Sequence, residues 1–197
     1  MLTPRDKSII KTLTLFRCLS RDQVASLFFQ KLKNPITSAN YVLKRLRREG
    51  YITANIEYTP YVYFPNPSLI KTSSQKIRHY LAIADFYIDI CKHEKPSVFL
   101  VEPRYGSEFM QPDIFMIWKN QPFFVEIQKS IYSSKVMMEK IGRYVKYYES
   151  GEWKKQDWQQ PNAACFPVLW IVSKNSYSLS LDKIQTIQTS DVESYFH

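Results

Sequence analysis

The first third of the chain carries apolar residues at helical spacing in three successive segments, followed by two short β-rich runs. The first two segments begin at Thr3 and Ser20, which are favourable N-cap residues. The third segment has one continuous apolar face, formed by Ala39, Val42, Leu43 and Leu46. Gly50 ends this segment, and the runs YITANI and YVYF follow around a Tyr-Thr-Pro turn. The pattern predicts three helices and a β-hairpin.

The remaining two thirds alternate between helical and strand patterns. HYLAIADFYIDICKHE and SSKVMMEKIGRYVKYYESGEW have helical stripes of apolar residues, whereas SVFLVEP, FMQPDIFMIWK and PFFVEIQ have the character of strands. FPVLWIVS is apolar throughout, which favours a central strand in a sheet with both faces covered. The order helix, three strands, helix, strand predicts a mixed α/β layer.

The side of the third predicted helix that faces away from its apolar stripe is polar and basic. Its residues, with the serine that opens the segment, are Ser38, Asn40, Tyr41, Lys44, Arg45, Arg47 and Arg48. The order of elements is that of a winged helix-turn-helix, and LKRLRREGYI resembles the end of the recognition helix in that superfamily. Such a helix fits the major groove of DNA, where polar side chains reach base edges and cations neutralise phosphates. Double-stranded DNA is therefore the predicted partner, with a solvated or protein-contacting basic helix as the alternative.

Charge is distributed unevenly along the chain, whose net charge is +9. Residues 1–78 contain 14 Lys and Arg and four Asp and Glu, a net charge of +10, and the rest of the chain has a net charge of −1. A basic N-terminal part indicates a polyanionic partner, although a bias toward solubility would give the same counts.

Several other classes of protein are disfavoured by composition. The chain has only four glycines and no GxxxxGK[ST] or GxGxxG motif, which argues against a glycine-rich phosphate loop. Its three cysteines lie far apart, which argues against a disulfide framework and a zinc knuckle. The polar N-terminus and the lack of an apolar run of about 18 residues predict a cytoplasmic protein that does not enter a membrane.

Two of the predicted strands carry acidic residues where a packed sheet usually has none. In PDIFMIWKNQPFFVEIQ, a two- or four-residue turn centred on Asn120-Gln121 pairs residues whose numbers sum to 241. Asp113 then lies opposite Gln128, and Glu126 lies opposite Phe115. This register predicts that Asp113, Glu126 and Gln128 cluster on one face of the sheet.

The oxygen atoms of this cluster suit a magnesium ion. Mg²⁺ prefers carboxylate and carbonyl oxygens and keeps waters or phosphate oxygens in its remaining positions. Such an ion can orient and deprotonate water for phosphodiester cleavage. Glu102, at the end of the preceding predicted strand, is a further candidate ligand. The sequence thus predicts a Mg²⁺ site at Asp113, Glu126 and Glu102, with a retired site or a solvated sheet edge as alternatives.

The same stretch resembles the PD-(D/E)-x-K pattern of restriction-endonuclease-like nucleases. Pro112-Asp113, a spacer and Glu126-x-Gln128 supply the elements of the pattern, with Gln128 in the position of its lysine. The resemblance makes Asp113, Glu126 and Gln128 candidate catalytic residues. Lys140 is the fourth candidate, because nucleases of this kind can supply a lysine or glutamine from the following helix.

A wider resemblance extends from about the first predicted helix to FPVLWIVS. A winged helix followed by HYLAIADFYI, QPDIFMIW, FFVEIQKS and EKIGRYVKYYESGEW is similar to the replication-relaxation family of plasmids and other mobile elements. The second strand of that family typically reads Glu-Val-Asp-Arg-Gly, whereas this chain has EIQKS, so Gln128 stands where the family has an aspartate.

The patterns and the resemblance together predict an α/β (α+β) protein with two domains. We expect a winged-helix DNA-binding domain at residues 1–66 and a linker at residues 67–78. Residues 79–197 should form a restriction-endonuclease-like mixed sheet flanked by helices.

Three functions are compatible with this organisation. The first is a DNA-binding accessory or initiator protein of plasmid or mobile-element replication or DNA transfer, with a degenerate nuclease-like domain and replication or relaxase proteins as partners. The second is a Mg²⁺-dependent DNA endonuclease or nickase guided by the winged helix. The third is a transcriptional repressor that forms a homodimer through its C-terminal part.

Overall fold

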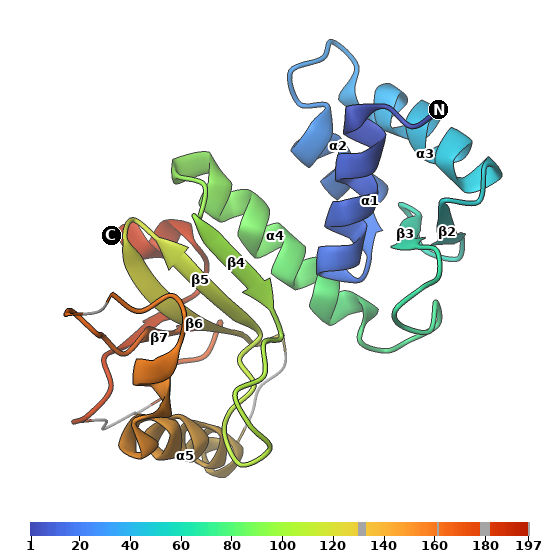
Figure 1. Ribbon diagram of the computed structural model, residues 1–197. Helices are drawn as coiled ribbons and strands as arrows, with labels where there is room; N and C mark the ends of the chain where they lie inside the picture. Colours follow the sequence, from blue (N-terminus) through green and yellow to red (C-terminus); the bar gives the residue numbers. More distant parts are fainter. Residues whose placement is uncertain (130–132, 161, 178–181, 197) are drawn as a thin grey trace. The chain divides into compact units, whose positions relative to one another are not determined.

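The chain folds into two compact units, each with its own sheet. The computed structural model describes residues 1–129, 133–160, 162–177 and 182–196 (Figure 1). The units are Met1–Ile88 and Asp89–His197, and the division between them lies within α4 (Ile77–His93). The predicted mixed α/β class is confirmed, whereas the predicted domain and linker boundaries stay a prediction.

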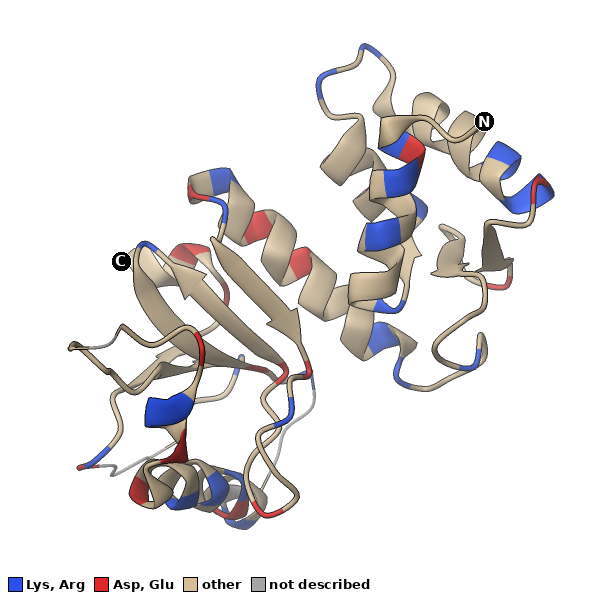
Figure 2. Ribbon diagram, viewed as in Figure 1, with Lys and Arg blue, Asp and Glu red and all other residues tan. Residues whose placement is uncertain are grey.

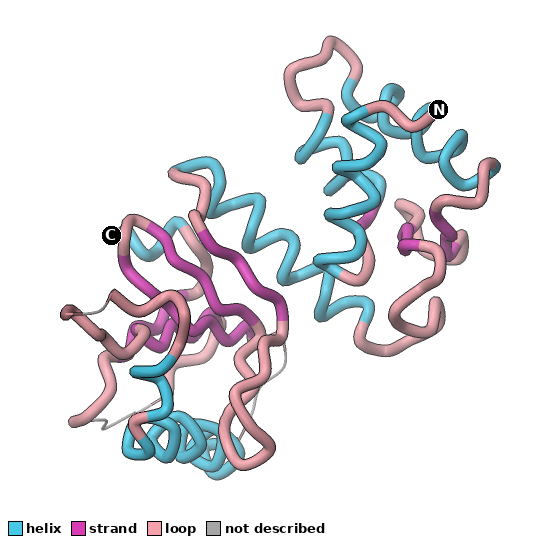
Figure 3. The backbone as a smooth tube through the Cα atoms, in the orientation of Figure 1, coloured by secondary structure: helices cyan, strands magenta, loops and turns pink. Residues whose placement is uncertain are grey.

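Helices and a small antiparallel sheet form the N-terminal unit (Figure 3). Before α4 its elements are α1 (Pro4–Phe16), β1 (Leu19–Ser20), α2 (Arg21–Phe28), α3 (Pro35–Arg48), β2 (Ile52–Asn55) and β3 (Val62–Pro65). β3 is the middle strand, because Tyr63 pairs with Leu19 of β1 and with Ala54 of β2. The three predicted helices and the hairpin are present in the predicted order, and assignment to the winged-helix superfamily stays a prediction.

Side-chain caps fix the starts of the first two helices. Thr3 Oγ1 accepts a hydrogen bond from the Asp6 backbone N–H, and the Asp6 carboxylate accepts one from the Thr3 N–H at 2.8 Å. Ser20 and Gln23 form the same reciprocal arrangement at the start of α2. These capping boxes satisfy backbone donors that a helix leaves unpaired, so the helix boundaries are encoded locally.

The apolar stripes of the helices meet the small sheet in one core. Its fully buried side chains include Ile9, Leu13, Phe16, Val24, Leu43, Leu46, Val62 and Phe64. The first half of α4 belongs to the same unit, since Gln23 Nε2 donates to the Leu81 carbonyl at 2.8 Å and to Asp85 Oδ1 at 2.6 Å. The predicted inward face of α3 is confirmed, with Ala39, Leu43 and Leu46 buried.

A five-stranded mixed sheet forms the C-terminal unit. Its elements after α4 are β4 (Val98–Val101), β5 (Ile114–Trp118), β6 (Gln121–Ile127), α5 (Ser134–Ser150), η1 (Glu152–Lys155), β7 (Val168–Val172), β8 (Thr186–Thr189) and η2 (Glu193–Phe196). The strand order is β4-β5-β6-β7-β8, antiparallel from β4 to β6 and parallel from β6 to β8. β7 therefore lies inside the sheet, as its apolar sequence predicted.

Helices and aromatic side chains cover the sheet of this unit. Met137, Ile141 and Tyr144 of α5 share a buried cluster with Phe115, Phe124, Leu169 and Ile171 of the sheet. Trp170 projects from the opposite face of β7, and its ring lies 4.7 Å from that of Tyr195 in η2. None of the helices in the described part of the chain is long and apolar enough to cross a membrane.

The β5–β6 hairpin turns one residue earlier than the sequence predicted. Its turn is Lys119-Asn120, both with positive φ (51° and 61°), and Trp118 pairs with Gln121. Positive φ at both central residues is the property of a type I′ turn, which suits the twist of a hairpin and tolerates asparagine. The predicted turn at Asn120-Gln121 is therefore wrong.

The predicted cross-strand partners are wrong for the same reason. Phe115 pairs with Phe124, not with Glu126, and paired residue numbers sum to 239. Pro122 pairs with Ile117, one step from the turn, at a position where the ladder requires no N–H from the proline. The observed sum of 239 differs from the predicted 241 by two. A shift of two residues keeps every side chain on its face of the sheet, so Asp113 and Glu126 still share one face, as predicted.

Candidate functional site

The outer face of α3 presents the residues that the sequence assigned to DNA binding. Asn40, Tyr41, Lys44, Arg47 and Arg48 are exposed, and Ser38 and Arg45 are half-buried. Figure 2 shows basic residues at the C-terminal end of α3 and along α1. Since Ala39, Leu43 and Leu46 hold the opposite face in the core, the polar face is fixed toward solvent.

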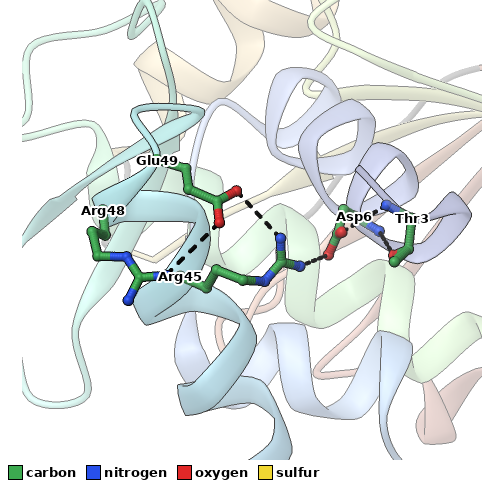
Figure 4. Close-up of polar contacts among 5 residues, drawn as sticks. All are labelled: Thr3, Asp6, Arg45, Arg48 and Glu49. Atoms are coloured by element: carbon green, nitrogen blue, oxygen red, sulfur yellow. Dashed lines mark hydrogen bonds and ion pairs between the residues drawn. The ribbon is translucent and has the colours of Figure 1, made fainter. Parts of the chain in front are cut away.

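Arg45 differs from its neighbours because it is engaged inside the N-terminal unit (Figure 4). Its Nη2 lies 2.6 Å from Oδ1 of Asp6, a side chain that is only 2% exposed, and its Nη1 lies 3.3 Å from Oε2 of Glu49. Arg48 lies 3.9 Å from Glu49, but its side chain is 76% exposed. Arg45 thus has a partner within the N-terminal unit. A contact between Arg45 and DNA stays a prediction.

The environment of Asp6 favours its charged form. Burial acts to raise the pKa of this carboxyl, but the hydrogen bonds from Arg45 and Thr3 outweigh it and hold the pKa below its usual value. Asp6 therefore performs two tasks: it completes the capping box of α1 and it binds the guanidinium of α3.

A second candidate site lies where β5 and β6 carry Asp113 and Glu126. Asp113 directly precedes β5, and its Oδ2 accepts a hydrogen bond from the Ile127 N–H at 2.7 Å. Glu126 Oε2 accepts from Lys140 Nζ at 2.5 Å, and Oε1 accepts from the Tyr144 hydroxyl at 2.5 Å. The structure thus brings together three of the four predicted catalytic residues, Asp113, Glu126 and Lys140.

Glu126 is a carboxyl in an unusual electrostatic environment. Burial raises its pKa to about 8, and the nearby charge of Asp113 acts in the same direction, against Lys140 and Tyr144. Burial and the adjacent carboxylate also raise the pKa of Tyr144 well above its ordinary value. Near neutral pH, Glu126 therefore holds a proton more readily than an ordinary glutamate.

The remaining two predicted residues have other contacts. Gln128 lies just beyond β6, and its Oε1 accepts a hydrogen bond from the Tyr177 hydroxyl at 2.7 Å. Glu102 lies just beyond β4 with φ of 48°, and its backbone N–H donates to the Asp113 carbonyl at 2.9 Å. The backbone of Glu102 is thus next to Asp113, as the order of the strands predicted.

In this arrangement the cluster does not fit a magnesium site. Both oxygens of Glu126 bind protein donors, one of them the ammonium group of Lys140, which lies where a cation would bind. The Gln128 carbonyl oxygen also has a protein donor. Among the described residues no group of three or more His, Cys, Asp or Glu could hold a metal ion.

Sequence reasoning missed the partners that make these two networks. No role was assigned to Tyr144 from the sequence, although Lys140 and Tyr144 are four residues apart and so lie on one face of a helix. An inward-facing glutamate on a strand requires such donors. Asp6 was missed because its partner Arg45 lies 39 positions away in the sequence.

The comparison with known proteins adds a family. Residues 67–162, just under half of the chain, match the family described as replication-relaxation. The matched segment contains α4, β4–β6 and α5. It thus includes Asp113, Glu126, Lys140 and Tyr144, which we call the carboxylate cluster, but not Tyr177, the partner of Gln128. No curated protein and no solved structure matches the chain significantly. The family match supports a role in replication or transfer of a plasmid or mobile element.

Proposed function

We propose, because residues 67–162 match the replication-relaxation family, that this chain is a DNA-binding accessory or initiator protein of plasmid or mobile-element replication or DNA transfer. The N-terminal unit binds duplex DNA through the outer face of α3. The C-terminal unit is a nuclease-like platform in which Lys140 and Tyr144 donate hydrogen bonds to the buried carboxyl group of Glu126.

The arrangement of α3 carries this proposal. Five polar or basic side chains are exposed along one face of a helix whose opposite face is anchored in a core: Asn40, Tyr41, Lys44, Arg47 and Arg48. A helix of this kind fits the major groove, where Asn40 can make paired hydrogen bonds to adenine and arginines can do so to guanine. Lys44 and the arginines can also neutralise phosphates, and they contribute to the net charge of +10 over residues 1–78.

Salt-dependent binding of duplex DNA tests the role of α3. Footprinting on the DNA that flanks the gene supplies the target, and fluorescence anisotropy gives Kd over a range of salt concentrations. We expect the double variant Lys44→Gln, Arg47→Gln to bind more weakly, with a log–log salt slope reduced by about two, since each lost phosphate contact removes roughly 0.9 from the slope. Lys135→Gln, an exposed lysine of α5, is the matched control and should leave the slope unchanged. An unaltered slope in the double variant would rule out the groove assignment.

Because Asp113, Glu126 and Lys140 lie together, one other function has to be tested, that of a Mg²⁺-dependent endonuclease. Incubation of supercoiled plasmid with the protein and Mg²⁺ or Mn²⁺ distinguishes the two proposals. We expect no nicked product, because both Glu126 oxygens are engaged by Lys140 and Tyr144. Nicking that depends on the metal and disappears in Asp113→Ala would instead establish the endonuclease.

A further inference from the structure

We propose that a pocket beside α3 binds a nucleoside phosphate, supplied by an unpaired nucleotide of a DNA strand; this inference rests on the proposed function and extends it. The pocket has a volume of about 390 Å³, within the range of small-ligand sites. The side chains that carry the argument come from α2, α3 and the β2–β3 hairpin: Arg21, Asn40, Lys44, Arg47, Tyr61 and Tyr63. All of them belong to the N-terminal unit.

The charge of the pocket selects an anion. Three of its side chains are cationic, Arg21, Lys44 and Arg47, and none of the described residues that line it is acidic. Arg21 is paired with Asp22 at 2.7 Å, but Asp22 is itself half exposed and lies outside the lining. Lys44 and Arg47 are exposed residues of α3 one turn apart, so both can turn toward one phosphate group.

The aromatic residues of the pocket select a planar ring. Tyr61 is 45% exposed, which leaves a face of its ring available for stacking, whereas Tyr63 is only 6% exposed and forms the floor. Burial raises the pKa of Tyr63 while the charges of Arg47 and Arg21 oppose this, as expected for cations that lie near its hydroxyl. Cations beside a tyrosine ring are the combination that proteins use to bind unpaired nucleotides.

The walls of the pocket are held by backbone hydrogen bonds. The Arg21 N–H donates to the Tyr61 carbonyl at 3.0 Å, and Ser20 of β1 pairs with Val62 of β3. These bonds join the start of α2 to the start of β3. The pocket is thus present before any ligand binds, which lowers the entropy lost on binding.

An unpaired nucleotide fits this pocket better than a duplex phosphate does. A phosphate on the outside of a duplex needs only cations on an open surface. Binding of such a phosphate would not use the pocket or the ring of Tyr61. A base within a duplex is stacked between its neighbours and cannot enter a pocket. Asn40 adds an amide that can both donate to and accept from the edge of a base.

A pair of DNA duplexes tests the inference, one continuous and one identical but with a single bulged nucleotide. We expect the full-length protein to bind the bulged duplex about 10-fold more tightly, the usual effect of stacking one base on an aromatic side chain. Tyr61→Leu should reduce the affinity for the bulged duplex to that for the continuous one. Thermal melting checks that this variant, altered at a partly exposed side chain, is folded.

Two arginines of α3 provide a matched comparison. Arg47→Gln and Arg48→Gln each remove one cation, so both should weaken binding of both duplexes, but only Arg47 lines the pocket. The preference for the bulged duplex should therefore fall in Arg47→Gln and persist in Arg48→Gln. Equal affinity of the unaltered protein for the two duplexes would overturn the inference and leave the proposed function intact. Failure to bind either duplex would overturn the proposed function itself.

A free nucleotide is the other source of the same chemistry. Titration with dAMP, followed by calorimetry, measures it directly. We expect binding at least about 10-fold weaker than to the bulged duplex, because a strand adds phosphate contacts along α3. Tight dAMP binding that Tyr61→Leu removes, without any preference for the bulged duplex, would overturn the assignment to a DNA strand.

Discussion

At the scale of single residues, the two acidic side chains that matter most have opposite electrostatics. Asp6 is held in its charged form by Arg45 and Thr3, with a lowered pKa. Glu126 is fully buried beside Asp113, with its pKa raised to about 8, even though Lys140 and Tyr144 both donate to it. Both side chains are almost completely buried, so exposure does not explain the difference. Asp113 beside Glu126 acts with burial to raise the pKa of Glu126, whereas Arg45 and Thr3 lower the pKa of Asp6.

The raised pKa of Glu126 makes stability depend on pH in a defined direction. The folded state retains a proton between the ordinary value of 4.5 and about 8, so stability falls as the pH rises through that range. Glu126→Gln removes the titration while keeping the shape of the side chain. Between about pH 5.5 and pH 8 the unaltered protein should lose unfolding free energy. In Glu126→Gln we expect this loss to be smaller by on the order of 2 kcal/mol, measured by urea denaturation.

Glu149→Gln is the control for this measurement. Glu149 is also a carboxylate next to a lysine, Lys183 at 2.6 Å, but both side chains are more than half exposed. Its substitution should leave the pH dependence of stability as it is in the unaltered protein. If Glu126→Gln shows the full pH dependence, the titration belongs to another group and the account of the carboxylate cluster fails.

At the scale of elements, sequence patterns predicted the helices and strands of both units but not all the contacts between them. Apolar spacing identified α1, α2 and α3, and local caps also marked the starts of α1 and α2, because both signals are encoded within a few residues. The β5–β6 register was wrong, since Lys119-Asn120 and Asn120-Gln121 are similar turn sequences and only backbone twist separates them. The prediction that Asp113 and Glu126 lie on one face of the sheet was unaffected, because it depends only on the alternation of side chains along each strand.

The contacts of the candidate sites were predicted less completely than the elements. The proximity of Asp113 and Glu126 followed from the hairpin, and that of Lys140 followed only from the resemblance to nucleases. The partnership of Arg45 with Asp6 could not be predicted, since the two residues are 39 positions apart. This pair forms only when α1 and α3 pack together.

The ion pair between Asp6 of α1 and Arg45 of α3 can be tested by its effect on stability. Arg45→Met leaves the buried Asp6 carboxylate without its cation, which is destabilising because an unpaired buried charge remains. We expect a clear decrease in Tm, whereas Arg48→Met, at a side chain that is 76% exposed, should change it little. Because Asp6 has a lowered pKa, its contribution is present above about pH 4 and is lost in acid. The Tm difference between Arg45→Met and the unaltered protein should therefore narrow as the pH falls; equal effects of the two substitutions would contradict the assignment.

At the scale of the whole molecule, the two units have separate cores and distinct chemistry. The N-terminal unit carries the excess of positive charge and the exposed face of α3, and the family match begins only at residue 67. The carboxylate cluster and the large sheet lie in the C-terminal unit, where acidic and basic residues nearly balance. The proposed DNA contacts therefore belong to a part of the chain that the family match mostly leaves out.

Separate cores imply that one unit can be loosened without the other. Leu43 of α3 and Leu169 of β7 are both fully buried, so Leu43→Ala and Leu169→Ala are matched substitutions in the two cores, each destabilising by about 2–5 kcal/mol. In hydrogen exchange measured by mass spectrometry, Leu43→Ala should speed exchange in α1, α2 and β3 and spare β5, β6 and β7, and Leu169→Ala should do the reverse. Within α4 the change should occur near residues 88 and 89, where the units divide. Faster exchange throughout both units in either variant would mean that the chain opens as one cooperative body, and the separation of DNA binding from the carboxylate cluster would lose its structural basis.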